Sequence, residues 1–439
     1  MEKKSQEWRD KIKIIFRTFH SRNYRLFFGG QCISLIGTWM QQIALSWLVY
    51  RITGSVFYLG LVGFANQIPS FFISPFAGVM TDKWNRHHIL IATQALSMVQ
   101  ALTLWLLVIT HSVTIWHILP LSLFLGVINS FDTPARHSFL IDMIENRENL
   151  SNAIALNSAM FNSARLIGPS IAGILIAWLG EGPCFLINGL SYIGVIAALL
   201  AMRLHGYSKQ EEGKNIFQEF KEGFNYTFGF LPIRALLLLL ALINLMGMSY
   251  VVLMPVVAKD ILMGGSHTMG FLMGASGAGA LLGAFYLASR KTVVGLSRKI
   301  PMALCLFSLS VIAISFSKNL YISLILMFLA GLGMITQMAS TNTVIQTLVD
   351  DDKRGRVMSF YAMSFMGISP FGSLLAGSLS KLIGVQYTIL IGGIACFIGF
   401  LIYEKNMPAI RLIIRSVYEK KGILTPKIPA AEDTFEFQG

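Results

Sequence analysis

The stretch LLLLLALINLMGMSYVVLMPVV, which runs from Leu236 to Val257, decides the fold class of this chain. It contains 22 residues and no charged side chain. The hydrocarbon core of a bilayer is about 30 Å thick, and a helix rising about 1.5 Å per residue needs about 20 apolar residues to cross it. The stretch is therefore predicted to be a membrane-spanning helix.

Similar apolar stretches recur along the whole chain. Only 13% of the 439 residues are charged and 54% are hydrophobic, with a mean hydropathy of +0.62. Since a soluble domain carries about 25% charged residues, lipid is expected to be the main solvent. We predict an all-α membrane protein with twelve transmembrane helices, near residues 25–50, 57–80, 88–110, 115–135, 152–178, 183–203, 234–258, 266–289, 300–316, 320–345, 357–380 and 384–403.

The basic residues are distributed unevenly between the two ends of these helices. If both termini are cytoplasmic, thirty of the 35 Lys and Arg fall on the cytoplasmic side, four fall on the opposite side, and Arg165 lies within a span. This asymmetry follows the positive-inside rule. Topology thus accounts for the net charge of +13, and no nucleic-acid partner is expected.

A polar stretch at residues 205–230 divides the spans into two sets of six. The sequence RLIGPSIAG, from Arg165 to Gly173, has a counterpart 201 residues later in MGISPFGSL, from Met366 to Leu374. Such a parallel repeat predicts two pseudo-symmetric six-helix bundles around a central cavity. The predicted units are an amphipathic cytoplasmic segment at 1–21, bundles at 22–203 and 234–404, a cytoplasmic linker at 204–233 and a cytoplasmic tail at 405–439.

The connector after the second span reads GVMTDKWNRHH and begins at Gly78. It resembles the signature loop of the major facilitator superfamily: Gly78, Asp82, Lys83 and Arg86 match, whereas Asn85 and His87 depart from the pattern. The resemblance implies the major facilitator fold, alternating access and a gate on the cytoplasmic side. We expect a relay of Asp82, Arg86 and Asp132 to form this gate, with a static surface ion pair as the alternative.

The fifth span contains a second motif. Gly168, Pro169 and Gly173 resemble the antiporter motif of drug:proton exchangers. Proline removes a backbone hydrogen bond and glycine permits close helix contact. We therefore predict that the span bends here against the glycine-rich eighth span.

Several polar residues within the spans are candidates for substrate binding. Arg165 is predicted near mid-depth, where an arginine costs at least ~2.5–3.5 kcal/mol to insert and normally faces a cavity or a partner. It is expected to contact an anionic substrate group, unless it only links helices by binding backbone carbonyls. Spans one, four, seven and ten line the cavity in the superfamily, which suggests Gln41, Asn129, Asn244 and Gln337; interhelical hydrogen bonding is the alternative for each.

Proton coupling usually needs a buried acid, and Asp132 is the one carboxylate predicted at a suitable depth.

The sequences GTWMQ at 37–41, FDTPAR at 131–136 and RGRVMS at 354–359 resemble bacterial macrolide efflux pumps, siderophore exporters and lysophospholipid flippases. The resemblance implies a monomeric, proton-coupled exporter of an amphipathic or anionic small molecule in the inner membrane, in contact with membrane lipids. A lysophospholipid flippase and a non-transporting ligand sensor remain open. No cofactor, metal site or enzymatic activity is expected, because the residues form no Ser/His/Asp or Cys/His cluster.

Overall fold

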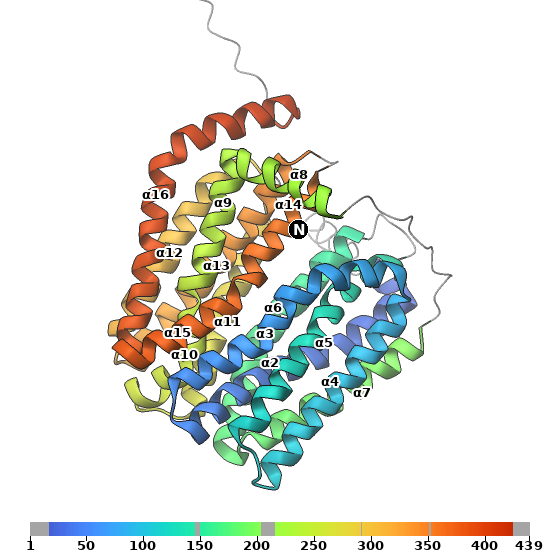
Figure 1. Cartoon of the computed structure of the whole chain (residues 1–439), viewed down its shortest axis with the longest axis vertical. Helices are drawn as coiled ribbons and strands as arrows, with labels where there is room; N and C mark the ends of the chain where they lie inside the picture. Colours follow the sequence, from blue (N-terminus) through green and yellow to red (C-terminus); the bar gives the residue numbers. More distant parts are fainter. Residues whose placement is uncertain (1–16, 145–149, 203–215, 291, 351–352, 425–439) are drawn as a thin grey trace, which may run out of the picture.

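The computed structural model describes residues 17–144, 150–202, 216–290, 292–350 and 353–424, which are almost entirely helical (Figure 1). Within these residues, twelve helical segments are long and apolar enough to cross a membrane. The predicted all-α class with twelve spans is confirmed. Parts of the predicted terminal segments and linker, at 1–16, 204–215 and 425–439, lie outside the described residues, as do the side chains of Asp82 and Lys83.

The helices of the first half follow one another through short turns. They are η1 (Arg17–His20), α2 (Arg22–Thr53), α3 (Val56–Lys83), α4 (Arg86–Ile109), α5 (Ile115–Asp142), α6 (Leu150–Leu179) and α7 (Gly182–Leu200). Helix α8 (Ile216–Gly229) precedes the second half. That half contains α9 (Leu231–Leu242), η3 (Ile243–Gly247), α10 (Ser249–Val256), η4 (Val257–Ile261), α11 (Ser266–Ala288), α12 (Leu296–Phe316), α13 (Leu320–Leu348), α14 (Arg354–Ala362), η5 (Met363–Gly367), α15 (Ser369–Ile383) and α16 (Val385–Lys420).

The seventh and eleventh spans are interrupted, which the hydropathy pattern did not predict. Short π-helical turns, η3 and η4 in the seventh span and η5 in the eleventh, separate their α-helical parts. Pro370 lies three residues after the end of η5 and has no N–H to donate to the carbonyl of Met366, which disfavours a continuous α-helix there. Turns of this kind occur frequently at functional sites.

The helix of the twelfth span continues well beyond residue 403, the predicted end of the span. Helix α16 continues to Lys420, and its side chains Met407, Ile410 and Ile414 are buried. The Nζ atom of Lys421 donates hydrogen bonds to the carbonyl oxygens of Thr347 (3.0 Å) and Val349 (2.8 Å) at the end of α13. A cation at a helix C-terminus is favourable, so the start of the predicted tail is attached to the second half.

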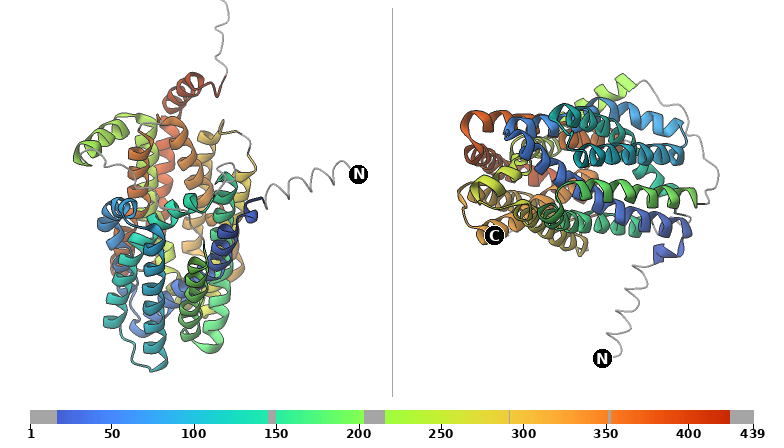
Figure 2. Two further views of the ribbon diagram at one scale, coloured as in Figure 1. Left: turned by 90° about the vertical axis from the view of Figure 1, so that its right-hand side faces the viewer. Right: turned by 90° about the horizontal axis from the view of Figure 1, so that it is seen from below.

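The two halves meet at one end of the molecule and diverge toward the other. Helix α3 packs against α15, and α6 packs against α11. Figures 1 and 2 show the halves side by side where α3, α10 and α15 meet, and spread apart toward α8. The end that contains the turns at 54–55, 180–181 and 384 is called the seam end here, and the end that contains α8 is called the open end.

Glycines allow both helix pairs at the seam end to approach closely. A Cβ atom on Gly60 would lie 2.8 Å from the Cα atom of Gly377, and one on Gly173 would lie 2.8 Å from the Cα atom of Gly270. Any side chain at these positions would force the helices apart. The backbones are therefore in direct contact, as in small-residue helix interfaces within lipid.

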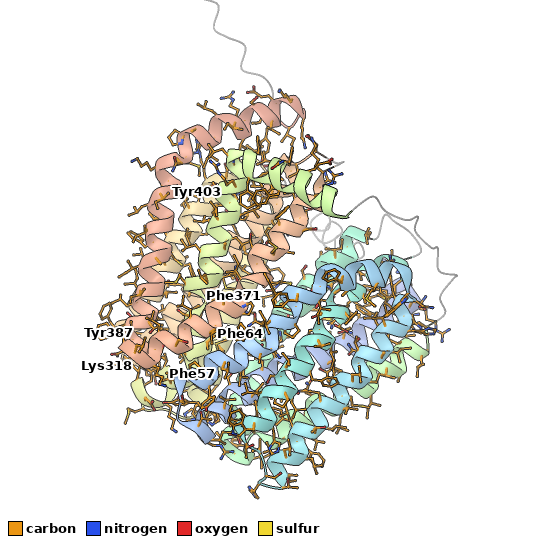
Figure 3. The ribbon with its side chains drawn as sticks, in the orientation of Figure 1. Phe57, Phe64, Lys318, Phe371, Tyr387 and Tyr403 are labelled. Atoms are coloured by element: carbon orange, nitrogen blue, oxygen red, sulfur yellow. The ribbon has the colours of Figure 1, made fainter. Side chains whose placement is uncertain are left out.

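Few polar contacts supplement this glycine packing. The hydroxyl of Ser266 donates to the carbonyl oxygen of Gly173 at 3.1 Å, and the phenol of Tyr50 donates to Asp260. The rings of Phe64 and Phe371 meet edge to face with their centres 6.2 Å apart (Figure 3). Among the ion pairs whose two partners are described, none joins one half to the other, so separation of the halves breaks no described ion pair.

The glycine contact yields a first prediction. Gly173→Ala places a Cβ atom against Gly270 and should weaken closure at the seam end. In a variant lacking the native cysteines, a cysteine at Val252 should then react faster with a membrane-impermeant maleimide added on the seam-end side. Gly29→Ala is the matched control, because a Cβ atom there has no atom within 4 Å. Equal labelling in both variants would contradict a closing role for Gly173.

Candidate functional site: a polar cavity beside the seam

A cavity of about 380 Å³ lies beside the α3–α15 contact and is lined by residues from both halves. Its volume is within the usual range for small-molecule sites. Polar groups inside a lipid-solvated bundle are costly and tend to mark a pathway or a site. The polar lining consists of Gln31, Ser34, Thr38, Gln41, Gln42, Ser46, Asn66, Gln67, Gln94, Ser97, Asn129, Asp132, Arg136, Asn188, Tyr192, Asn244, Ser369 and Ser373.

An ion pair lies in the wall of this cavity. Asp132 and Arg136 are one turn apart on α5, and the guanidinium of Arg136 donates to one carboxylate oxygen of Asp132. The other oxygen accepts hydrogen bonds from Thr93 (2.9 Å) and Gln94 (2.8 Å) on α4. The Asp132 side chain is only 3% exposed. Its charge is thus compensated by one cation and two neutral donors.

Arg136 also faces the first helix. Its second terminal nitrogen donates to the Oε1 atom of Gln31 on α2, at 3.3 Å. The arginine side chain is 29% exposed, so it is the more accessible member of the pair. An anion that enters the cavity would meet this guanidinium and would compete with Asp132 for it.

The predicted relay of Asp82, Arg86 and Asp132 is only partly covered by the described residues. Asp132 contacts Thr93, Gln94 and Arg136, and no described contact joins it to Arg86. Arg86 begins α4, two helical turns before Thr93, whereas Arg136 is one turn from Asp132 on the same helix. The relay of Asp82, Arg86 and Asp132 therefore stays a prediction for another conformation, and the side chains of Asp82 and Lys83 lie outside the described part.

Gln41 lines the cavity but belongs to a network of buried side-chain amides. Its Nε2 atom donates to Gln100 at 2.9 Å, and its Oε1 atom accepts from Asn188 at 2.7 Å. Asn188 also donates to the phenol oxygen of Tyr192 at 3.4 Å. This is the interhelical bonding that the sequence left open, and it joins α2, α4 and α7.

Asn129 and Asn244 also line the cavity. The amide of Asn244 donates to the carbonyl oxygen of Leu240 at 2.9 Å, and η3 carries this residue into the lining. The side chain of Asn129 has no hydrogen bond to another described residue. Its amide is therefore the better placed of the two to bind a ligand.

The other two predicted binding residues do not line the cavity. Gln337 is 1% exposed and donates to the hydroxyl of Thr341 on its own helix, at 3.2 Å. Arg165 lies with its guanidinium 5.7 Å from the ring centre of Trp39 and 3.8 Å from the sulfur of Met334. It occupies a separate position between the halves.

The residues predicted to bend the fifth span contribute close contacts, and the bend itself stays a prediction. Helix α6 runs from Leu150 to Leu179 without a break, with Pro169 inside it. A Cβ atom on Gly168 would lie 2.6 Å from the Cβ atom of Trp39 on α2, and Gly173 contacts α11. The two glycines thus bring α6 against neighbours on two sides.

Arg136 is not among the cavity residues predicted from the sequence, because its position near the end of the fourth span places it with the cytoplasmic cations. A signal was present in the spacing: an aspartate and an arginine four residues apart can pair on one helix face. Gln94 and Asn188 gave no comparable signal, since their positions depend on how α4 and α7 pack.

The chain matches known families over nearly its whole length. The family described as "Transmembrane secretion effector", MFS_3, matches residues 15–415. The chain belongs to this family. It is a multi-pass transporter of the major facilitator superfamily, and this confirms the resemblance seen in its motifs.

Curated relatives include transporters of different compounds. The staphyloferrin A transporter of Staphylococcus aureus is 28% identical over 378 residues, covering 84% of this chain and 93% of the relative. The multidrug efflux pump Tap of Mycolicibacterium fortuitum is 24% identical, covering 79% and 87% respectively. Macrolide efflux protein A of Streptococcus pyogenes is 21% identical, covering 84% and 93%.

Solved structures agree on the fold. The human organic anion transporter MFSD10 has a TM-score of 0.64 at 14% identity, covering 87% of this chain and 99% of its own. A bacterial homolog of the human lysosomal transporter Spinster, in an inward-facing and unoccupied conformation, has a TM-score of 0.62 at 13% identity, covering 93% and 98%. At such identities the likeness concerns the fold alone.

The ion pair yields a second prediction. Asp132→Asn or Arg136→Gln alone leaves a poorly compensated charge in the bundle and should lower the free energy of unfolding by about 2 kcal/mol or more. The double variant should lose less free energy of unfolding than the sum of the losses in the two single variants. Unfolding in mixed detergent micelles measures all three. The i,i+4 pair of Arg415 and Glu419 on α16, which is more exposed than the pair of Asp132 and Arg136, is the matched control and should change by no more than ~1 kcal/mol. Additive effects at Asp132 and Arg136 would contradict the pairing.

Proposed function

We propose that this protein exports an amphipathic or anionic small molecule, of the siderophore or drug-like class, across the bacterial inner membrane by alternating access. The cavity between the halves carries the proposal, because it places polar groups from both halves inside an otherwise apolar bundle. The relatives that transport staphyloferrin A, drugs and macrolides support efflux as the direction.

The charge distribution supports a cytoplasmic position for the open end. In that orientation the seam end faces outward, and this conformation receives substrate from the cytoplasm. Export then requires α3 and α15, and α6 and α11, to separate at the seam end while the open end closes. The matched superfamily loop, with Gly78, Asp82, Lys83 and Arg86, is proposed to hold the closed cytoplasmic end.

Proton coupling is proposed to use Asp132. In this conformation its carboxylate is paired with Arg136. An exchanger carries its ligand and the proton in alternate half-cycles, so we propose that the ligand binds while Asp132 is ionised and that a proton binds to Asp132 for the return step. Asp132 would then bind a proton in one conformation of the transporter and release it in the other. We propose that the protein does this as a monomer.

The carboxamides of the lining favour a ligand with many oxygen atoms. Nine Asn and Gln side chains face the cavity, against a single ion pair of Asp132 and Arg136. Amides both donate and accept hydrogen bonds, so they suit hydroxyl, carbonyl and carboxylate groups without fixing one ligand. A lysophospholipid would need its acyl chain in a far less polar site, which makes the flippase the weaker alternative.

A flux measurement tests the function. Proteoliposomes that contain the purified chain should take up staphyloferrin A or a macrolide faster when the lumen is more acidic than the medium. Asp132→Asn should abolish the dependence on the pH gradient, whereas Glu419→Gln, which removes a half-buried paired carboxylate outside the cavity, should leave it intact. Movement of lysophosphatidylethanolamine alone would indicate a flippase. Binding without flux of any probe would indicate a sensor, and either result would contradict the proposed export.

A further inference from the structure

Arg165 is a cation without a carboxylate partner among the described residues. A guanidinium has five N–H donors. The contacts described for this one are the sulfur of Met334, which is a weak acceptor, and the face of the Trp39 ring. In contrast, the guanidinium of Arg136 is neutralised by Asp132. A charge at membrane depth that lacks a counterion in the protein is costly and marks a functional position.

Arg165 also lies where the two halves begin to diverge. Along α6, the glycine contacts with α11 run from Gly173 against Gly270 to Arg165 and Leu166 against Gly277. No described glycine contact with the second half lies nearer the open end on α6. The guanidinium is therefore at the closed end of the space between the halves, and its side chain is partly exposed.

Two buried hydroxyl groups lie in the same region. Tyr250 on α10 is close enough to Arg165 for electrostatic interaction, and its phenol is within hydrogen-bonding reach of the hydroxyl of Ser276. Both residues are 1% exposed, and among the described residues neither hydroxyl has another partner. A hydroxyl group both donates and accepts hydrogen bonds, so one O–H of this pair stays available to donate to a ligand.

We propose that Arg165, Tyr250 and Ser276 form an anion site, separate from the polar cavity, that binds a single carboxylate or phosphate group. Trp39 and Met334 contact the guanidinium from opposite halves and support the apolar part attached to that group. Because the site takes residues from both halves, it is complete only while they are in this arrangement. A bound anion therefore stabilises this conformation over the one with the seam end open. Anion binding at this site does not depend on the proposed export function. Only the suggestion that the natural ligand is an exported substrate rests on that function.

Anion binding can be measured without transport. The full chain, in nanodiscs of phosphatidylcholine, is titrated with citrate by calorimetry. Arg165→Met, which keeps the length of the side chain without its charge, should weaken binding at least about tenfold, as expected for loss of a charge-assisted contact. Tyr250→Phe should weaken it several-fold. Arg234→Gln removes an exposed arginine and should have no effect. An unchanged Kd in Arg165→Met, or an equal loss in Arg234→Gln, would overturn the proposal.

A second arm identifies the source of the anion. If a lipid phosphate fills the site, phosphatidylglycerol in the nanodiscs should compete with citrate in the native chain and raise its melting temperature. Arg165→Met should lose that rise. If a soluble carboxylate fills it, citrate affinity should be the same in both lipids. Arg165→Lys, which keeps the charge, covers the case in which Arg165→Met fails to fold and should retain part of the affinity. The absence of any difference between the native chain and these variants, in either lipid, contradicts the site.

The two proposals fail in different ways. Loss of citrate affinity in Arg165→Met, together with no flux by the native chain, would leave the anion site standing and remove the export function. Flux with an unchanged KM for anionic probes in Arg165→Met would leave export standing and remove the site.

Discussion

The close approach of two helix pairs, α3 with α15 and α6 with α11, determines how everything else in this structure is arranged. Glycines bring the backbones together at the seam end, where a single Cβ atom would collide with the facing helix. Between helices in lipid, hydrophobic burial gives little preference for association, so dispersion contacts and a few hydrogen bonds hold the halves. An interface of this kind is tight in one register and contains no described ion pair that must break when it opens.

The two helix contacts between the halves also explain why Arg136 has a carboxylate partner and Arg165 has none among the described residues. Arg136 lies within the first half, where helical spacing provides Asp132 as its partner, and that pair stays together when the halves move. Arg165 lies at the contact between the halves, next to residues that change neighbours when the seam opens. A permanent counterion there would oppose the movement, whereas a transient anion from outside the protein can be bound and released during it.

Much of the fold could be predicted from the sequence, because its causes are local. Runs of 20 or more apolar residues require membrane helices, and the repeat around Pro169 and Pro370 gives the two halves. The cavity was predicted less well. Gln41, Asn129 and Asn244 reach it because their spans line the space between the halves. Arg165 and Gln337 do not, since their direction depends on helix rotation, which hydropathy in α6 and α13 leaves open. The π-helical turn at η3 likewise depends on tertiary packing around Asn244.

Distances between spin labels on the two halves test the central claim that the halves pivot where α3 meets α15 and α6 meets α11. One pair, at Ser112 and Lys318, reports on the seam end, and another, at His88 and Asn225, reports on the open end; all four positions are exposed. Pulsed electron resonance across a range of pH should show two populations in each pair. The distance at the seam end should lengthen as the distance at the open end shortens. Distances that stay fixed at both ends, or that lengthen together, would contradict the account.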